Sequence, residues 1–195
     1  MRIREVVLPA ADPSVPAAFH PESYGSTRVR FEHGPEACSH FAVNVPPDRF
    51  EEAVAWARAQ AELIQDDVPF PLWLARAAYY FDPAGNLVEL IARERAPGDE
   101  LLIEVSEVGL PVADVGAAVG FFEAELGLPH FSGDRENFSA VGDDHGLFIL
   151  VPVGRAWLFT DRPASNAPVR VTIEGPSARE LRVPGSEHLI EVAST

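Results

Sequence analysis

Glu89 is the residue whose surroundings point most directly to chemistry, because it is a charged residue inside an apolar stretch. Residues 87–93 read Leu-Val-Glu-Leu-Ile-Ala-Arg, and Glu89 stands between Val88 and Leu90. A buried carboxylate costs free energy unless it is solvated, paired with a charge or bound to a cation. The sequence therefore predicts a specific partner for Glu89.

A hairpin is expected to position this glutamate. Residues 77–81 and 87–93 are rich in β-forming side chains, and Asp-Pro-Ala-Gly-Asn separates them. Aspartate and proline favour the start of a tight turn, whereas glycine and asparagine tolerate a positive φ. The pattern predicts two antiparallel strands with Glu89 in the second.

Other strands and helices follow from hydrophobic periodicity and from prolines and glycines. Three prolines in residues 10–21 are expected to prevent a normal helix there. Residues 66–71 are expected to form a loop, and Gly127 to end the second helix. The predicted strands are 2–8, 27–32, 40–45, 63–64, 102–112, 137–141, 146–151, 156–160 and 169–173, and the predicted helices are 46–61 and 116–126.

The two halves of the chain repeat one pattern. Residues 5–12 read Glu-Val-Val-Leu-Pro-Ala-Ala-Asp, and residues 107–114 read Glu-Val-Gly-Leu-Pro-Val-Ala-Asp. The tail at 185–192 resembles a weaker copy of 85–90. Four copies of a β-(α)-β-β unit are therefore predicted, with one helix lost in each half. We expect one domain at 1–95, with modules 1–35 and 36–95, and a second, reduced domain at 100–195.

Composition limits the classes of partner. The 30 acidic residues outnumber the 15 basic ones, and the net charge of −15 disfavours binding to nucleic acid. A single cysteine, Cys38, excludes an internal disulfide framework and fits a reducing cytoplasm. The sequence shows neither a signal peptide nor a membrane span, so we expect a cytoplasmic protein without a membrane partner.

The hairpin Phe-Asp-Pro-x-Gly-Asn-x-x-Glu-Leu and the repeat resemble the vicinal oxygen chelate superfamily, which includes glyoxalases, bleomycin-resistance proteins and ring-cleaving dioxygenases. The resemblance implies an α+β fold of paired βαβββ modules, with mixed, mostly antiparallel sheets around a cleft. It also implies a small-molecule ligand or substrate, and it is compatible with a homodimer.

The resemblance also implies a set of site residues. Carried over position by position, the metal ligands fall on Glu5, His40 and Glu89. A fourth position falls on Arg30 or Glu32, and Glu32 and Glu89 are the candidates for proton transfer. One imidazole with carboxylates suits Zn²⁺, Ni²⁺, Mn²⁺ or Fe²⁺. In the second half Glu107 and Glu191 remain, but the other positions fall near Ile149 and Pro168, so that half is expected to be metal-free.

Two functions stay open at this point, beside the simpler possibility that the second domain serves mainly for dimerisation. One is a metal-dependent lyase, isomerase or dioxygenase of the glyoxalase-like type. The other is a non-catalytic protein that binds or sequesters a small molecule, in which His40 donates to a carboxylate and Arg30 neutralises another. The sequence discloses neither the substrate nor how the four modules pair.

Overall fold

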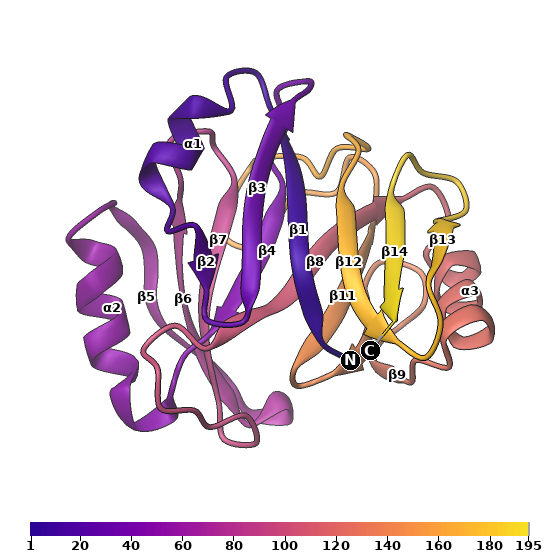
Figure 1. The fold of residues 1–195 in the computed structure, drawn as a ribbon. Helices are drawn as coiled ribbons and strands as arrows, with labels where there is room; N and C mark the ends of the chain where they lie inside the picture. The colour runs from indigo at the N-terminus through magenta and orange to yellow at the C-terminus, as the bar shows by residue number, and fades with distance from the viewer. Residues whose placement is uncertain (195) are drawn as a thin grey trace.

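The computed structural model describes residues 1–194, which form two mixed β-sheets and three short α-helices. The six-stranded sheet has the order β13-β14-β12-β1-β3-β2, and the eight-stranded sheet has the order β5-β6-β7-β4-β8-β11-β10-β9. In Figure 1, α2 and α3 lie at opposite ends of the molecule. This architecture confirms the predicted α+β fold.

The first two modules occupy residues 3–93. The first contains β1 (Ile3–Ala10), α1 (Ser14–Phe19), β2 (Ser23–Tyr24) and β3 (Thr27–His33). The second contains β4 (His40–Asn44), a 3-10 turn (Pro47–Arg49), α2 (Phe50–Arg58), β5 (Leu63–Phe70), a second 3-10 turn (Pro71–Trp73), β6 (Ala75–Phe81) and β7 (Leu87–Arg93).

The last two modules occupy residues 104–194. The third contains β8 (Glu104–Val112), α3 (Val115–Leu126), β9 (His130–Gly133), β10 (Ser139–Asp143) and β11 (Gly146–Pro152). The fourth contains β12 (Arg170–Gly175), β13 (Arg179–Arg182) and β14 (Leu189–Ser194). Within the described residues the fourth module has no helix between its strands, as the sequence predicted.

The modules pair across the two halves of the chain. Strand β1 pairs antiparallel with β12, so the first and fourth modules share the six-stranded sheet. Strand β4 pairs antiparallel with β8, so the second and third modules share the eight-stranded sheet. Neither sheet coincides with residues 1–95 or 100–195, and that division stays a prediction about the repeat in the sequence.

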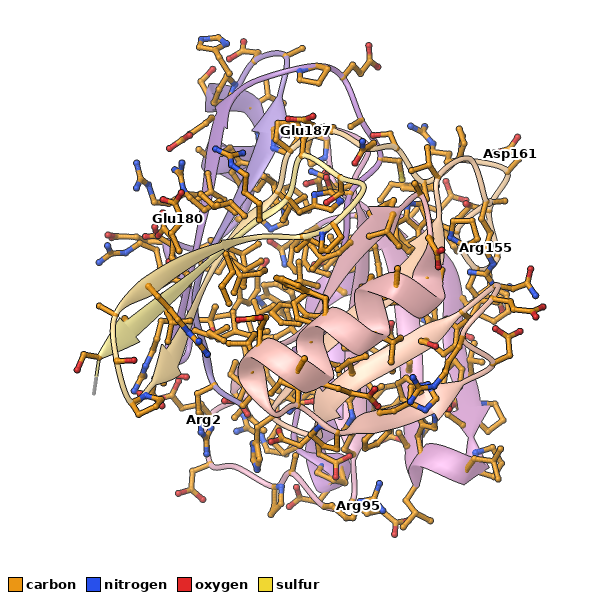
Figure 2. The ribbon with its side chains drawn as sticks, turned by 90° about the vertical axis from the view of Figure 1, so that its right-hand side faces the viewer. Arg2, Arg95, Arg155, Asp161, Glu180 and Glu187 are labelled. Atoms are coloured by element: carbon orange, nitrogen blue, oxygen red, sulfur yellow. The ribbon has the colours of Figure 1, made fainter. Side chains whose placement is uncertain are left out.

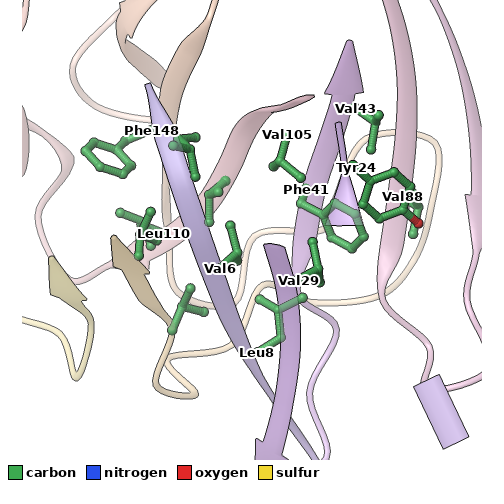
Figure 3. Close-up of a cluster of buried hydrophobic side chains, with 14 of the residues drawn as sticks. Val6, Leu8, Tyr24, Val29, Phe41, Val43, Val88, Val105, Leu110 and Phe148 are labelled. Carbon is green, nitrogen blue, oxygen red and sulfur yellow. The ribbon is translucent and has the colours of Figure 1, made fainter. Parts of the chain in front are cut away.

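One large hydrophobic core lies on one face of the eight-stranded sheet. It combines side chains of both sheets with Phe50 of α2 and Phe122 of α3. Figure 3 shows Val6 and Leu8 of β1 and Phe41 of β4 among the side chains of this core. Side chains alternate between the two faces of a strand, so the neighbours of these core residues along β4, β7 and β8 point to the opposite face.

The structure corrects three local predictions. Residues 14–19 form α1 despite their prolines, because Pro13 is the N-cap and Pro16 lies in the first turn, where its missing N–H costs no helical hydrogen bond. Residues 66–70 belong to β5, an edge strand whose exposed side chains resemble those of a loop. Residues 156–160 form a turn and one isolated bridge, Ala156 to Pro163, instead of a strand.

The predicted hairpin and helix end are confirmed. Strands β6 and β7 pair antiparallel. Ala75 is opposite Arg93 at one end, and Phe81 is opposite Leu87 at the turn. Asp82 accepts backbone hydrogen bonds from Ala84 and Asn86, which closes the turn. Gly127 ends α3 in the left-handed conformation, with a φ of 64°. The hairpin therefore places Glu89 inside the eight-stranded sheet.

Separating the halves of the chain tests the cross-half pairing. We expect residues 1–97 and 98–195, each expressed alone, to lack cooperative unfolding in urea, because each half carries only part of both sheets. The first half exposes the unpaired edges of β1 and β4, and the second half exposes those of β8 and β12. Circular dichroism during the titration measures this, with the full chain as control. A cooperative transition in either isolated half would contradict the expectation.

Candidate functional site

Three neighbouring strands place three ionisable side chains on one face of the eight-stranded sheet. Strand β4 lies between β7 and β8. Its Ala42 is opposite Glu89 on one side and opposite Glu107 on the other. His40 is two residues earlier on β4 and therefore points to the same face. The small side chain of Ala42 leaves space between the two carboxylates.

His40, Glu89 and Glu107 form a compact buried group. Each offers one nitrogen or oxygen atom that lies within 4.8 Å of those of the other two. The Nε2 atom of His40 is 3.6 Å from Oε2 of Glu89. The exposed fractions of the three residues are 5%, 4% and 3%, so water does little to solvate them. Such a cluster requires protons, counter-charges or a cation.

His40 is oriented as a nitrogen donor toward this group. Its Nδ1 is 3.1 Å from the backbone carbonyl of Leu87, and a donor at Nδ1 leaves the lone pair of Nε2 facing Glu89. Burial lowers the pKa of His40 to about 4, so the ring is neutral at neutral pH. A neutral imidazole whose other nitrogen donates to a carbonyl has the arrangement of a metal-binding histidine.

Gly109 makes room for the aromatic wall beside His40. A Cβ atom at Gly109 would lie 2.6 Å from the ring of Trp157 and 3.1 Å from Cβ of His40. The rings of His40 and Trp157 pack with their centroids 5.1 Å apart. The indole Nε1 of Trp157 donates to the carbonyl of Cys38 at 2.8 Å, which fixes the ring.

Both carboxyl groups are shifted toward their protonated forms. Burial raises the pKa of Glu89 well above its usual value, the charge of Glu107 raises it further, and Arg93 and Tyr79 oppose the shift. Burial also raises the pKa of Glu107, whereas the charge and hydrogen bond of Arg93 oppose the shift. A cation between these groups would take the place of the protons.

Arg93 is the site residue that the sequence interpretation missed. Its guanidinium is fully buried and forms an ion pair with Glu107. It also donates to Oδ1 of Asn44 at 2.6 Å and to Oγ of Ser106 at 3.0 Å. The sequence contained the information that places Arg93 near Glu89. Arg93 follows Glu89 by four positions on β7, and alternation places both side chains on one face of the strand.

The three groups lie in the wall of an apolar cavity of about 220 Å³. The second and third modules both contribute to it. Its other lining residues are Phe70, Trp73, Tyr79, Leu87, Ile91, Phe138, Ile149, Arg155, Trp157 and Leu158. An apolar cavity with a few polar groups is the usual form of a small-molecule site.

The structure does not bring Glu5 or Glu32 to this cavity. Glu5 lies on β1 in the other sheet, with its carboxylate 3.6 Å from Arg28 and 3.7 Å from Arg30. Glu32 is exposed on β3 and accepts a hydrogen bond from Arg170 at 2.7 Å. The residue that joins His40 and Glu89 is instead Glu107, the counterpart of Glu5 in the repeat, because β8 and not β1 pairs with β4.

The strand register also identifies a fourth residue, which stands where the third module repeats the position of Glu89. Ala42 on β4 is opposite Glu89 on β7, and Gly109 on β8 is opposite Ile149 on β11. Ile149 is therefore the counterpart of Glu89 in the third module, and it lines the cavity. Its aliphatic side chain cannot bind a cation, so the described residues supply three ligand groups there.

No protein-family model matches this sequence, and no curated protein sequence matches it. Within the described residues, no helix is both long and apolar enough to cross a membrane.

Solved structures do match. A candidate dioxygenase from Bacillus subtilis is similar with a TM-score of 0.65 at 14% identity, over 100% of this chain and 85% of that chain. Glyoxalase I from Zea mays is similar with a TM-score of 0.60 at 13% identity, over 98% of this chain and 91% of that chain. This chain has the fold of the vicinal oxygen chelate superfamily, as its closing hairpin and its internal repeat predicted.

Proposed function

We propose that this protein binds a small molecule in the cavity and acts on it with a divalent metal ion held by His40, Glu89 and Glu107. The observation that supports this proposal is the convergence of three buried ligand atoms within 4.8 Å in an apolar cavity. The reaction class is that of a glyoxalase-like lyase, isomerase or dioxygenase.

The residues present fit such an ion. One imidazole and two carboxylates form a nitrogen and oxygen set suited to Zn²⁺, Ni²⁺, Mn²⁺ or Fe²⁺. The Leu87 carbonyl orients His40, and the ion pair with Arg93 fixes Glu107. When bound, the ion would supply a Lewis acid that polarises a substrate oxygen.

Glu89 is the residue proposed to move a proton. When no ion is bound, burial and the charge of Glu107 raise its pKa, so it holds a proton nearer to neutral pH than an ordinary glutamate does. Arg93 stabilises the ionised form of Glu107, so the two carboxyl groups differ in their environment. The apolar wall formed by Trp73, Phe138 and Trp157 excludes water from a bound substrate.

A second function is a binding protein without chemistry, and one observation favours it. The guanidinium of Arg93 already forms an ion pair with Glu107, which satisfies one carboxylate without a metal ion. In that case Glu89 keeps its proton and the cavity holds a ligand unchanged. A cytoplasmic location and a homodimer stay predictions from the sequence.

Replacing His40 tests the metal site. We expect protein purified without chelator to retain a divalent ion, and His40→Ala and Glu89→Gln each to weaken its affinity roughly tenfold or more, because each removes a direct ligand. Metal analysis and the rise in melting temperature on adding Zn²⁺, Ni²⁺, Mn²⁺ or Fe²⁺ measure this.

His33→Ala is the matched control, because His33 is exposed and bonds only to the carbonyl of Ala11 among the described residues. Equal metal affinity in the wild type and both site variants would contradict the proposed ligands. Stabilisation by aromatic compounds alone, with no effect of divalent ions, would favour the binding protein.

The pH dependence of metal affinity gives a separate test. The pKa values of Glu89 and Glu107 are raised, so at lower pH protons occupy the atoms that would hold the ion. We expect affinity to strengthen as pH rises from about 5 to about 8, with release of protons on binding. His40 contributes little in this range, because its pKa is about 4.

Titration calorimetry in buffers of different ionisation enthalpy measures the released protons. Glu89→Gln should release fewer protons than the wild type, because it lacks one of the raised carboxyl groups. Affinity that stays constant over this range would contradict the assignment of these carboxylates as ligands.

A further inference from the structure

Arg155 stands apart from the other arginines of this acidic chain. All 15 basic residues are arginine, against 30 acidic residues. Most arginines of the described residues have a carboxylate oxygen within 4.0 Å, but Arg155, Arg162 and Arg182 have none. An arginine without such a partner is notable where carboxylates are twice as numerous.

Among these three arginines, only Arg155 lines the cavity. The guanidinium of Arg162 lies 4.5 Å above the ring of Phe81, outside the cavity lining. Arg182 is exposed on β13, in the six-stranded sheet. Arg155 is half-buried on the loop after β11, at the edge of the molecule in Figure 2. Arg155 is therefore the one arginine among the described residues that line the cavity.

The backbone around Arg155 is held in place. Its N–H donates to Pro152 at 3.1 Å, and its carbonyl accepts from Ala164 at 2.8 Å. Two residues later, Trp157 donates from its backbone to Arg162 at 3.0 Å and lines the same cavity. Arg155 is thus held on a fixed backbone, so the loop does not have to become ordered when a ligand binds.

We infer that Arg155 binds an anionic group of the ligand, and that the cavity takes a small aromatic molecule with one carboxylate. This inference rests on the proposed function only in treating the cavity as a small-molecule site. A guanidinium binds a carboxylate through two parallel hydrogen bonds. The aromatic body packs against Trp73, Phe138 and Trp157, whose rings provide apolar contact area.

Charge also determines which end of the ligand lies at Arg155. Glu89 and Glu107 offer an anion no positive charge, because the guanidinium of Arg93 is already paired with Glu107, whereas the guanidinium of Arg155 attracts a carboxylate. The anionic end therefore lies at Arg155, and the uncharged end faces the three ligand groups. Arg93 does not compete for the anion, because it is fully buried and forms an ion pair with Glu107.

Binding of phenylacetate and of its neutral analogue phenylacetamide tests this inference. Quenching of tryptophan fluorescence is the readout, because Trp73 and Trp157 line the cavity. We expect EDTA-treated wild-type protein to bind phenylacetate roughly tenfold more tightly than phenylacetamide. Arg155→Gln should abolish this preference and leave the affinity for phenylacetamide unchanged, and Arg155→Lys should restore part of it.

Arg162→Gln is the matched control, because it removes the same charge from the same loop outside the cavity lining and should keep the preference. Equal binding of the two probes, a preference that survives Arg155→Gln, tighter binding of benzylamine, or no saturable binding of phenylacetate would each overturn the inference.

The EDTA-treated protein separates this inference from the metal proposal. An Arg155-dependent preference in the EDTA-treated protein would support the anion site whether or not a metal binds, and a failure of protein purified without chelator to retain a divalent ion would contradict the metal site alone. Metal retention that depends on His40, without an Arg155-dependent preference, would support the metal site and overturn the anion site.

Discussion

The site depends on a shortage of positive charge in the sheet interior. Glu89 and Glu107 are both buried beside Ala42, and of these two carboxylates the guanidinium of Arg93 forms an ion pair with Glu107. Two ionised carboxylates with one buried arginine leave one negative charge uncompensated, and an uncompensated buried charge is costly. A proton on Glu89 or a cation beside His40 would remove this cost. The cluster is therefore suited to take up a proton or to bind a cation.

The pairing of β4 with β8 creates this situation. It joins the second and third modules into one sheet and brings Glu107 opposite Ala42. The same pairing gives the sheet a continuous apolar face, where Phe41 and Leu110 pack in the core shared with the other sheet. The stabilisation gained by burying that face offsets the cost of holding the polar group on the opposite face.

Local structure was predictable from the sequence, whereas the pairing of modules was not. Alternation and turn residues predicted the hairpin around Glu89, and Gly127 predicted the end of α3. Glu5 and Glu107, however, begin the same repeated motif, and nothing local indicates which of them meets His40. That choice depends on contacts between strands far apart in the chain, so the sequence placed His40 and Glu89 together and assigned Glu107 to a separate domain.

The second and third modules differ at one of the four equivalent positions around the cavity, and this difference makes one side of the cavity polar and the other apolar. Register makes His40 equivalent to Glu107 and Glu89 equivalent to Ile149, so polar groups occupy three of four related positions. An ion held by three side chains keeps at least one coordination position open for water or substrate. Here the fourth position is apolar and adjoins the wall that contains Trp157. The aliphatic side chain of Ile149 at this position therefore places apolar surface beside the polar cluster, where an organic molecule can make contact.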